Sequence, residues 1–357
     1  MSQIERIIYS GVLPESFFAI PQKIYEGLGF LPEENREEVE ALFQLKRKDH
    51  DIIIYTDHKN IRLVGIFPQQ SVTAYFGYWE STNDPDLNSS AFRMLEEDAQ
   101  KFGKASLTGP TNFNTFHRYR LRLGPVPSWT MFDREPVNPG YYPALLGNLN
   151  CRISLTYESR RIPAAEIQKI YRDKQRFVEE VKQLPFEIIP LTPENWHLYE
   201  KDIYELIEAI FSGNAGYKTI EPEEFGLLYN RKFAEKLCPY TASLFRDTKT
   251  GKLVALTFCH PNYKSVSGEI PDFPSFEVDY PRLKNPTMLA KSSGVHPAYR
   301  KMNLMNYSGA YAMLSFKELY DDTIFCLMKT DNYSRHFTDG IPCEKAFYAL
   351  YEKSLGH

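Results

Sequence analysis

The feature of this sequence that most constrains its fold is an order of elements that occurs twice. In residues 34–110 a helical segment, an apolar hairpin, a strand, a helix and another strand follow one another, and residues 221–329 repeat that order. Each hairpin is predicted by two apolar runs around a polar turn, at 51–67 and 240–258. The repeat predicts two α+β domains in tandem, each a mixed sheet flanked by helices.

The two repeats are separated by a charged stretch at 159–185. It follows the strand-like run CRISLTYES and ends at Pro185, and its apolar residues recur at roughly helical intervals. A chain of 357 residues is also longer than one ordinary domain. We therefore expect an N-terminal domain at 1–159, a connecting helix at 160–184 and a C-terminal domain at 185–357.

Composition and charge argue against several classes of protein. The formal net charge of −4 gives no electrostatic reason to expect nucleic acid or an anionic membrane as a partner. No apolar run approaches the ~18 residues of a membrane span, and the N-terminus does not resemble a signal peptide. The five cysteines form no CxxC pair, and the histidines show no HExxH spacing. We expect a cytoplasmic protein without a membrane span, a disulfide framework or a metal.

Two further patterns suit a ligand or a partner. Aromatic residues make up 14% of the chain, which fits either an aromatic-lined cavity or aromatic-rich cores. In NTFHRYRLRLG, basic and apolar side chains alternate, which predicts a strand whose basic side chains face solvent or an acidic partner. These basic residues are His117, Arg118, Arg120 and Arg122.

A basic turn follows the strand at 286–297. His296, Arg300 and Lys301 cluster where the helix at 304–320 should begin. This arrangement is typical of a phosphate site, because the N–H groups and the dipole of a helix N-terminus favour anions. However, the glycines that let a backbone wrap around phosphate are missing between Gly294 and Gly309.

The segment SGVHPAYRKMNLM (293–305) resembles the fourth strand and acyl-donor loop of the GNAT superfamily of acyl-CoA-dependent N-acyltransferases. In that loop an Arg or Gln precedes two small residues; Arg300 keeps the first position, whereas Asn303 and Met305 replace the small residues. The resemblance extends to two GNAT-like domains in tandem. It implies that the donor is bound by Ser293, Gly294, Val295, His296, Arg300, Lys301 and Asn303.

Other parts of the chain carry weaker motifs. Residues 329–353 are similar to the superfamily's closing helix and strand, with Asn332 and Ser334 at the usual polar positions. The first half resembles poorly characterised GNAT-like proteins through a Gly-Pro-x-Asn stretch and an Asn-Pro-x-Tyr-Tyr stretch. These are Gly109, Pro110 and Asn112, then Asn138, Pro139, Tyr141 and Tyr142.

The resemblance implies an acyl thioester on a phosphopantetheine arm as donor. Because Asn303 and Met305 crowd the approach of a pyrophosphate, two donors stay open. Acyl-CoA would be held less closely, with Arg300 and Lys301 compensating. An acyl carrier protein would bring one phosphate and an acidic surface that suits the same basic residues. A decayed site with solvated basic side chains is the third alternative.

Acyl transfer to an amine needs an unprotonated amine, a polarised thioester carbonyl and a proton for the departing thiolate. By the resemblance, a backbone N–H in residues 292–295 polarises the carbonyl. The superfamily's usual acidic Tyr position falls on Phe337, which has no proton to give. The candidate bases are Glu80, His117, His296 and His336, and the candidate acid is Tyr333 beside Asn332.

By resemblance, we expect an N-acyltransferase that moves a medium or long acyl group from a CoA or carrier-protein thioester to an amine. The acceptor would be a primary amine of a peptide side chain or an amino acid, as in lipopeptide and natural-product biosynthesis, and the aromatic residues would line an acyl tunnel. Three alternatives stay open: acetylation of a small amine, Fem-type aminoacyl transfer, and a GNAT-like pair that only binds. The acidic net charge argues against the Fem type, which uses aminoacyl-tRNA.

Overall fold

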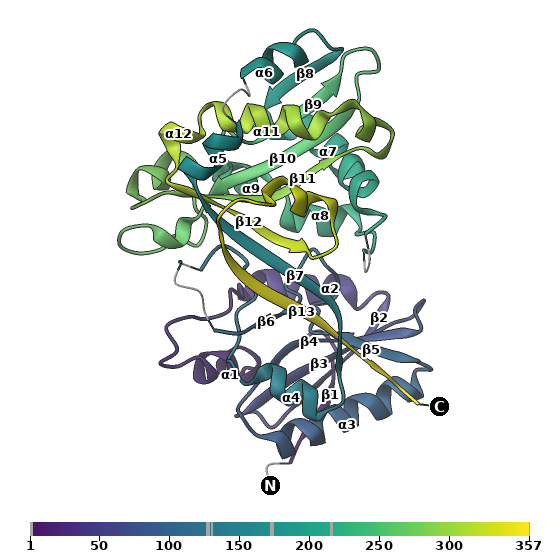
Figure 1. Cartoon of the computed structure of the whole chain (residues 1–357). Coiled ribbons are helices and arrows are strands. Elements are labelled where there is room, and N and C mark those ends of the chain that lie inside the picture. Colours follow the sequence, from purple (N-terminus) through teal and green to yellow (C-terminus); the bar gives the residue numbers. More distant parts are fainter. Residues whose placement is uncertain (1–2, 126–128, 130, 172–174, 215–216, 357) are drawn as a thin grey trace. The chain divides into compact units, whose positions relative to one another are not determined.

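The computed structural model describes residues 3–125, 129, 131–171, 175–214 and 217–356, and the chain divides into two compact units (Figure 1). Unit 1 contains residues 1–126, 134–157 and 346–357, and unit 2 contains residues 127–133 and 158–345. The predicted boundary at residue 159 lies inside strand β7 (Arg152–Pro163), which begins in unit 1 and ends in unit 2. Strand β13 (Glu344–Ser354) belongs to unit 1 from residue 346 onward. Neither unit is therefore a single stretch of chain.

Unit 1 is built on a mixed sheet. Its strands β1 (Glu5–Ile8), β2 (His50–Thr56), β3 (Ile61–Pro68) and β4 (Thr73–Ser81) pair antiparallel, and β5 (Ser106–Gly109) joins β4 in parallel. The order continues through β13 and β7, and β6 (Leu121–Leu123) also pairs with β13. The helices of unit 1 are α1 (Ser16–Ile24), α2 (Arg36–Lys46), α3 (Pro85–Lys101) and α4 (Tyr142–Asn148).

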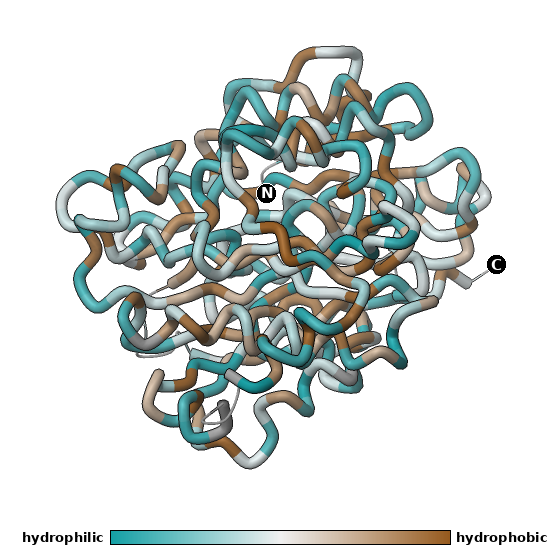
Figure 2. Tube along the Cα trace, turned by 90° about the horizontal axis from the view of Figure 1, so that it is seen from above, coloured by the Kyte–Doolittle hydropathy of each residue, from teal (hydrophilic) through white to brown (hydrophobic). Residues whose placement is uncertain are grey.

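Helices cover both faces of this sheet because its strands are apolar on both sides. In β2, Ile52 and Ile54 pack with Phe43 of α2, whereas Ile53 packs with Phe92 of α3. The continuous apolar run of β2 is thus a strand buried on both faces. The buried residues of these strands are mostly apolar. Figure 2 shows hydrophobic and hydrophilic residues interspersed along the chain, with hydrophilic residues in many of the outer loops.

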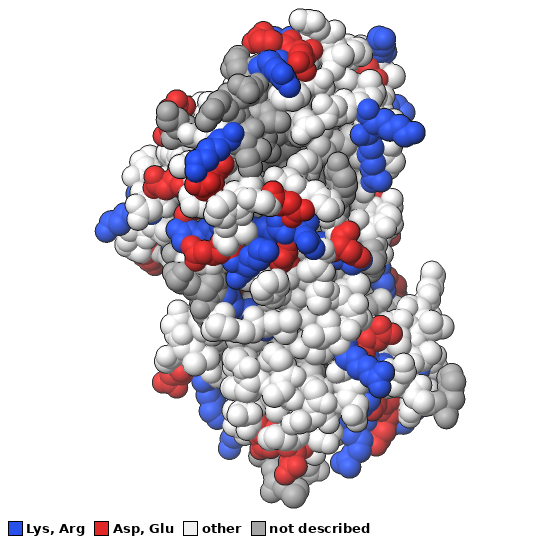
Figure 3. Space-filling view, viewed as in Figure 1, with Lys and Arg blue, Asp and Glu red and all other residues white. Residues whose placement is uncertain are grey.

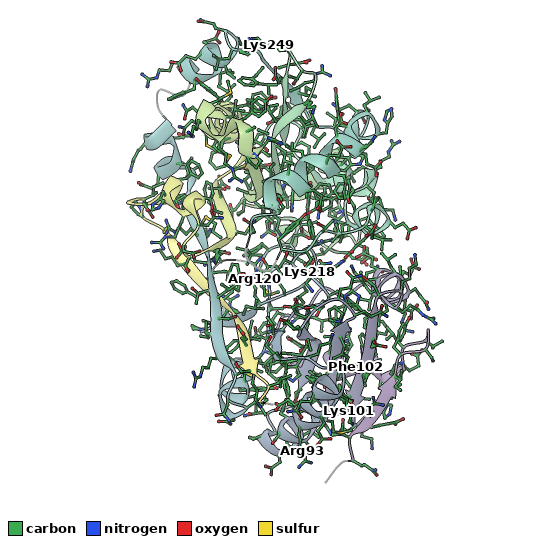
Figure 4. All side chains as sticks on the ribbon, turned by 90° about the vertical axis from the view of Figure 1, so that its right-hand side faces the viewer. Arg93, Lys101, Phe102, Arg120, Lys218 and Lys249 are labelled. Carbon is green, nitrogen blue, oxygen red and sulfur yellow. The ribbon has the colours of Figure 1, made fainter. Side chains whose placement is uncertain are left out.

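Both ends of α3, the 17-residue helix of unit 1, follow from its sequence. Asp84 caps the N-terminus by accepting a hydrogen bond from the Leu87 N–H (2.9 Å), and Pro85 lies in the first turn. Beyond the last residue, Lys101, the ring of Phe102 stacks on Phe67 with ring centroids 4.7 Å apart (Figure 4). The helix is thus capped at its start and followed by a ring contact with β3.

Unit 2 repeats the element order of unit 1, as the sequence predicts. Strands β8 (Phe186–Pro190), β9 (Ser243–Asp247), β10 (Leu253–Pro261) and β11 (Thr287–Val295) pair antiparallel, and β12 (Asp322–Lys329) joins β11 in parallel. The helices of unit 2 are α5 (Ala164–Tyr171), α6 (Gln175–Val181), α7 (Trp196–Phe211), α8 (Pro222–Leu228), α9 (Arg231–Lys236), α10 (Phe276–Asp279), α11 (Leu304–Leu314) and α12 (Phe316–Leu319). Short 3-10 turns are η1 (Tyr263–Ser265), η2 (Tyr280–Arg282), η3 (Pro297–Met302) and η4 (Tyr333–Thr338).

Helices α7 and α9 cover one face of the unit 2 sheet, and α11 covers the other. On the first face, the Phe258 ring of β10 contacts Trp196 of α7 and Phe233 of α9, with centroids 6.3 and 5.3 Å away. The preceding residue, Thr257, points to the opposite face, where its hydroxyl bonds to Ser308 of α11. This alternation assigns the neighbouring side chains of β10 to one face or the other.

Two predicted helices differ from the observed elements. Residues 160–163 continue strand β7 instead of beginning the connecting helix, because Arg160 is buried in an ion pair with Glu158 (2.5 Å) and Ile162 is fully buried. The helix expected at 221–237 is broken into α8 and α9, because the Asn230 side chain caps the second one by accepting from the Phe233 N–H (3.2 Å).

Candidate active site

The parallel strands β11 and β12 of unit 2 separate partway along their length. They pair from Thr287 and Asp322 up to Ala290 and Phe325, and no later pair joins them in the described chain. Further along β12, the Leu327 N–H donates to the Ser159 hydroxyl of β7 (3.0 Å), so β12 bonds there to β7. The opening between β11 and β12 is this stretch of the sheet beyond their last pair.

One edge of β11 faces this opening. The His296 N–H donates to the Val254 carbonyl of β10 (2.8 Å), and Gly294 and Ser292 lie opposite Leu256 and Phe258. Since hydrogen-bonded positions alternate in an antiparallel pair, the N–H and C=O groups of the intervening Ser293 and Val295 point away from β10. The backbone of these two residues is therefore directed at the opening.

The predicted donor loop forms a tight basic turn at the end of β11. His296 begins it by accepting a hydrogen bond from the Ala298 N–H (3.2 Å), and Asn303 ends it with φ 60° and ψ 18°. Asn is the residue other than Gly that adopts this left-handed conformation most readily, so Asn303 replaces the expected glycine without backbone strain. Arg300, Lys301 and Asn303 are exposed, and α11 starts without a side-chain cap.

The corresponding opening in unit 1 is filled by the chain itself. Beyond the pairs of β4 with β5, the Thr111 N–H donates to the Phe76 carbonyl (2.8 Å), and the Asn112 side chain accepts from the Tyr78 N–H (2.7 Å). A Cβ on Gly77 would lie 2.4 Å from the Thr111 carbonyl oxygen. The Gly-Pro-x-Asn stretch therefore closes unit 1 where unit 2 is open.

The helix that follows β4 also differs from its counterpart in unit 2. Asp84 occupies the N-terminus of α3 as its cap, and Asp86 lies in the first turn. Acidic side chains at this position repel a phosphate that the helix dipole would otherwise attract. Within the described residues, only unit 2 combines an open strand edge with a basic turn.

Glu80, one of the predicted bases, is fully buried in an ion network of unit 1. Its carboxylate accepts hydrogen bonds from Arg118 (2.9 Å) and from the Tyr142 hydroxyl (2.8 Å), and Arg118 also pairs with Glu34 (3.4 Å). Burial, followed by the nearby Glu80 charge, raises the pKa of Tyr142 well above its usual value. These contacts favour a structural role for Glu80 over that of a catalytic base. His117 is half-buried in the same unit.

The alternating arginines lie neither on a solvent-exposed strand face nor on a surface open to a partner, which are the two interpretations that the sequence suggested. Arg118 pairs with Glu80, and Arg122 is buried against Glu135 (2.6 Å). The Arg120 guanidinium, labelled in Figure 4, lies 3.7 Å from the Tyr119 ring centroid and 4.1 Å from that of Tyr157. Only residues 121–123 form a strand, β6. This removes one reason to expect an acidic carrier protein as partner.

The other candidates in unit 2 lie at the end of β12. Asn332 is exposed and directly precedes η4, which begins at Tyr333; the Tyr333 side chain is outside the part that the structure describes. His336 is exposed and its ring contacts Asp339 (2.7 Å). Around β7 and β12, acidic and basic side chains lie next to one another and form no patch of one sign (Figure 3).

Unit 2 also contains a polar cluster that the sequence did not indicate, made by Asp133, Lys236, His260 and Lys291. One oxygen, Oδ2 of Asp133, lies 3.0 Å from Lys236 Nζ, 3.4 Å from His260 Nε2 and 3.8 Å from Lys291 Nζ. Lys291 also donates to the Asp133 backbone carbonyl. The one available signal was Lys291 itself, a lone charge in an otherwise uncharged strand.

The electrostatics of this cluster are set by burial and by its two ammonium groups. Burial alone would raise the pKa of Asp133, but Lys236 and Lys291 hold it well below its usual value. Burial lowers the pKa of His260, against the opposing effect of Asp133. These shifts favour an ionised carboxylate at Asp133 and a neutral imidazole at His260.

No family model matches the sequence, and the comparison with curated proteins finds no match either. Solved structures are similar to the whole chain. A tandem GNAT protein from the clavulanic acid biosynthesis pathway has a TM-score of 0.52 at 10% identity, with 99% of both chains covered. A conserved protein from Enterococcus faecalis V583 has a TM-score of 0.53 at 9% identity, covering 99% of this chain and 73% of that one.

A GCN5-related N-acetyltransferase from Kribbella flavida has a TM-score of 0.50 at 8% identity, covering 99% of this chain and 71% of that one. At such identities the likeness shows the fold alone. The chain has a tandem GNAT fold, which confirms the predicted fold class. In the described residues, no group of side chains could hold a metal ion, and no helix has the length and apolarity to cross a membrane.

Proposed function

We propose that this chain is an N-acyltransferase that uses an acyl thioester and has one working donor site, in unit 2. A difference between the two parallel strand pairs supports this. Beyond their last pair, β11 and β12 leave an opening, and backbone N–H and C=O groups of β11 point toward it. In unit 1, residues 111–112 fill the corresponding gap beside β4. An extended ligand with amide groups adds to such an edge as another strand would. The pantetheine arm of the donor has this chemistry.

In this proposal each part of the donor has a place along β11 and the basic turn. Ser293 and Val295 bond to the pantetheine arm, and Arg300 and Lys301 bind its phosphates beside the uncapped start of α11. Asn303 keeps the left-handed turn that a glycine would form, while its side chain stays beside the donor. The donor in this proposal is acyl-CoA, held less closely and with Arg300 and Lys301 compensating.

The reaction requires the acceptor amine to attack the thioester carbonyl carbon. A C–N bond forms, the carbonyl oxygen gains negative charge, and the C–S bond then breaks; the amine loses a proton and the thiolate gains one. The carbonyl would lie where β11 and β12 part, so that a backbone N–H of residues 292–295 stabilises the oxyanion. The predicted groups of unit 2 for the two protons are His296, His336 and Tyr333.

The test of this function is the number of donors bound per chain. Calorimetric titration with acetyl-CoA is expected to give one site per chain, because residues 111–112 fill the corresponding gap beside β4 in unit 1. A primary amine added to this complex should release free CoA thiol. Two equivalent sites, or none, would contradict the proposal.

The packing of the aromatic rings supports the proposal of a short acyl group in place of the medium or long one that the resemblance implied. The rings that were expected to line a tunnel pack on one another, for example Phe43 on Phe17 and Phe113 with centroids 5.6 and 5.2 Å apart. In unit 2, Phe233, Phe258 and Trp196 form a similar set. We therefore propose acetyl or another short acyl group, with a primary amine as acceptor.

Acetyl-CoA and decanoyl-CoA are expected to raise the melting temperature by similar amounts, within about 2 °C at equal concentration. Burial of eight further CH₂ groups would add roughly 0.8 kcal/mol each, so a tunnel would produce a far larger shift for decanoyl-CoA. Differential scanning fluorimetry with both donors, and with CoA alone as control, distinguishes the two. If decanoyl-CoA raised the melting temperature several degrees more than acetyl-CoA does, the result would contradict a short acyl group and support an acyl tunnel.

A further inference from the structure

The cluster of Asp133, Lys236, His260 and Lys291 lies where the opening of unit 2 begins. In β11, Lys291 is the extra residue of a bulge, because Ala290 and Ser292 face the adjacent residues Cys259 and Phe258 of β10. The last pair between β11 and β12 ends at Ala290. Lys291 is thus the residue at which β11 leaves β12, beside the place proposed for the thioester carbonyl.

The cluster lies on the face of the sheet that α7 and α9 cover. Lys236 ends α9, and His260 follows Phe258 at an interval of two along β10, so that it shares the face on which Phe258 contacts α7 and α9. The donor turn leads instead into α11, which packs on the opposite face. An acceptor that entered over the α7 and α9 face would reach the carbonyl without crossing the donor.

Charge within the cluster is unbalanced. Two ammonium groups face the single carboxylate of Asp133, and the three side chains are 13% (Lys236), 17% (Lys291) and 23% (Asp133) exposed. Partial burial weakens the screening of such charges by solvent. A second anion would therefore be attracted to this surplus, whereas a cationic group would be repelled.

His260 provides an independent sign of a missing partner. Its side chain is 1% exposed, and its Nδ1 bonds to the Pro261 carbonyl (2.8 Å), so in the neutral ring Nδ1 carries the proton and Nε2 the lone pair. Nε2 has no hydrogen-bond partner among the described residues and faces Asp133 Oδ2 at 3.4 Å. Two acceptors facing each other in a buried site leave a polar atom unsatisfied.

From this charge surplus and the unsatisfied imidazole we infer that the cluster binds an anionic group, a carboxylate or a phosphate, that the acceptor amine carries. The inference rests on the proposed function and names its substrate class: amino acids or aminoalkyl phosphates, not simple amines. When the anion binds, it replaces the Asp133 carboxylate as the ion-pair partner of one lysine. His260 then takes up a proton at Nε2, and this N–H donates a hydrogen bond to Asp133. Lys236 and Lys291 are positioning residues in this inference.

The experiment uses the full chain saturated with acetyl-CoA and follows thiol release with paired acceptors. The panel contains the common amino acids with their α-carboxamides, and phosphoethanolamine with ethanolamine. We expect the anionic member of a pair to exceed its neutral partner at least thirtyfold in kcat/KM, mainly through KM. Whether carboxylates or phosphoethanolamine react best identifies the source of the anion.

Variants of the cluster then test whether these residues cause the preference. Lys291→Met and Lys236→Met should each reduce the preference at least tenfold, and Lys291→Arg should restore most of it because it keeps the charge. Lys232→Met, on the exposed side of the same helix α9, is the matched control and should leave it unchanged. Three results would overturn the inference. Anionic and neutral acceptors could be used equally, no anionic acceptor could be turned over, or the preference could be unchanged in both methionine variants. Acetyl-CoA titration of the same samples reports separately on the proposed donor site.

Discussion

Replacing Arg300 and Lys301 together by Glu is expected to weaken acetyl-CoA binding at least a hundredfold without unfolding the protein. Both residues are exposed in the turn before α11, and the substitution removes one 3.3 Å hydrogen bond from the Arg300 guanidinium to the Ile210 carbonyl, which lies outside the apolar core. Each charge-assisted hydrogen bond contributes on the order of 1.5–3 kcal/mol, and a factor of ten corresponds to about 1.4 kcal/mol. Titration calorimetry measures the change in Kd, and the KM of the amine should hardly change.

The matched control reverses two other exposed basic residues of unit 2, Lys249 and Lys252, at the turn between β9 and β10. Lys249→Glu with Lys252→Glu changes the net charge by the same amount but is not expected to alter donor affinity more than threefold. If both double variants weakened binding equally, a general electrostatic effect would account for it. If neither did, the basic turn would not be a phosphate site.

Most of the fold could be predicted from the sequence because its signals are local. The apolar hairpins and the repeated order of elements both arise between residues close in the chain. The shared strands could not be predicted in this way. Pairing of β13 with β5 joins Tyr351 to Gly109, and no local pattern indicates which of two similar sheets a closing strand enters.

The candidate site was predicted only in part for the same reason. The turn at 296–303 is local, and the structure has a short basic turn there. The cluster around Asp133 joins residues from four separate parts of the chain. The alternating arginines suggested an exposed strand. Alternation alone does not reveal that Arg118 and Arg122 form ion pairs with the buried residues Glu80 and Glu135.

Substitution of Arg118 by Met is expected to lower the free energy of unfolding of unit 1 by about 3–5 kcal/mol, because it leaves the buried Glu80 carboxylate without its cation. The Tyr142 hydroxyl would remain as a partner of that carboxylate, but a hydroxyl does not neutralise it. Urea denaturation followed by tryptophan fluorescence measures the loss. Glu80→Gln combined with Arg118→Met should recover part of it, since both charges are then removed together.

The same variants separate a structural role of Glu80 from the catalytic one that its position in the sequence suggested. Glu80→Gln keeps the shape of the side chain and removes its basicity, so a general base lost in this way would lower kcat by 10²–10⁴-fold. We expect kcat to stay within threefold of the parent protein, measured at low temperature where the variant remains folded. The reason is that Arg118 and Tyr142 already occupy both carboxylate oxygens, and the gap beside β4 is filled by residues 111–112. A hundredfold loss of kcat in a fully folded Glu80→Gln variant would instead locate the chemistry in unit 1 and refute the assignment of the reaction to unit 2.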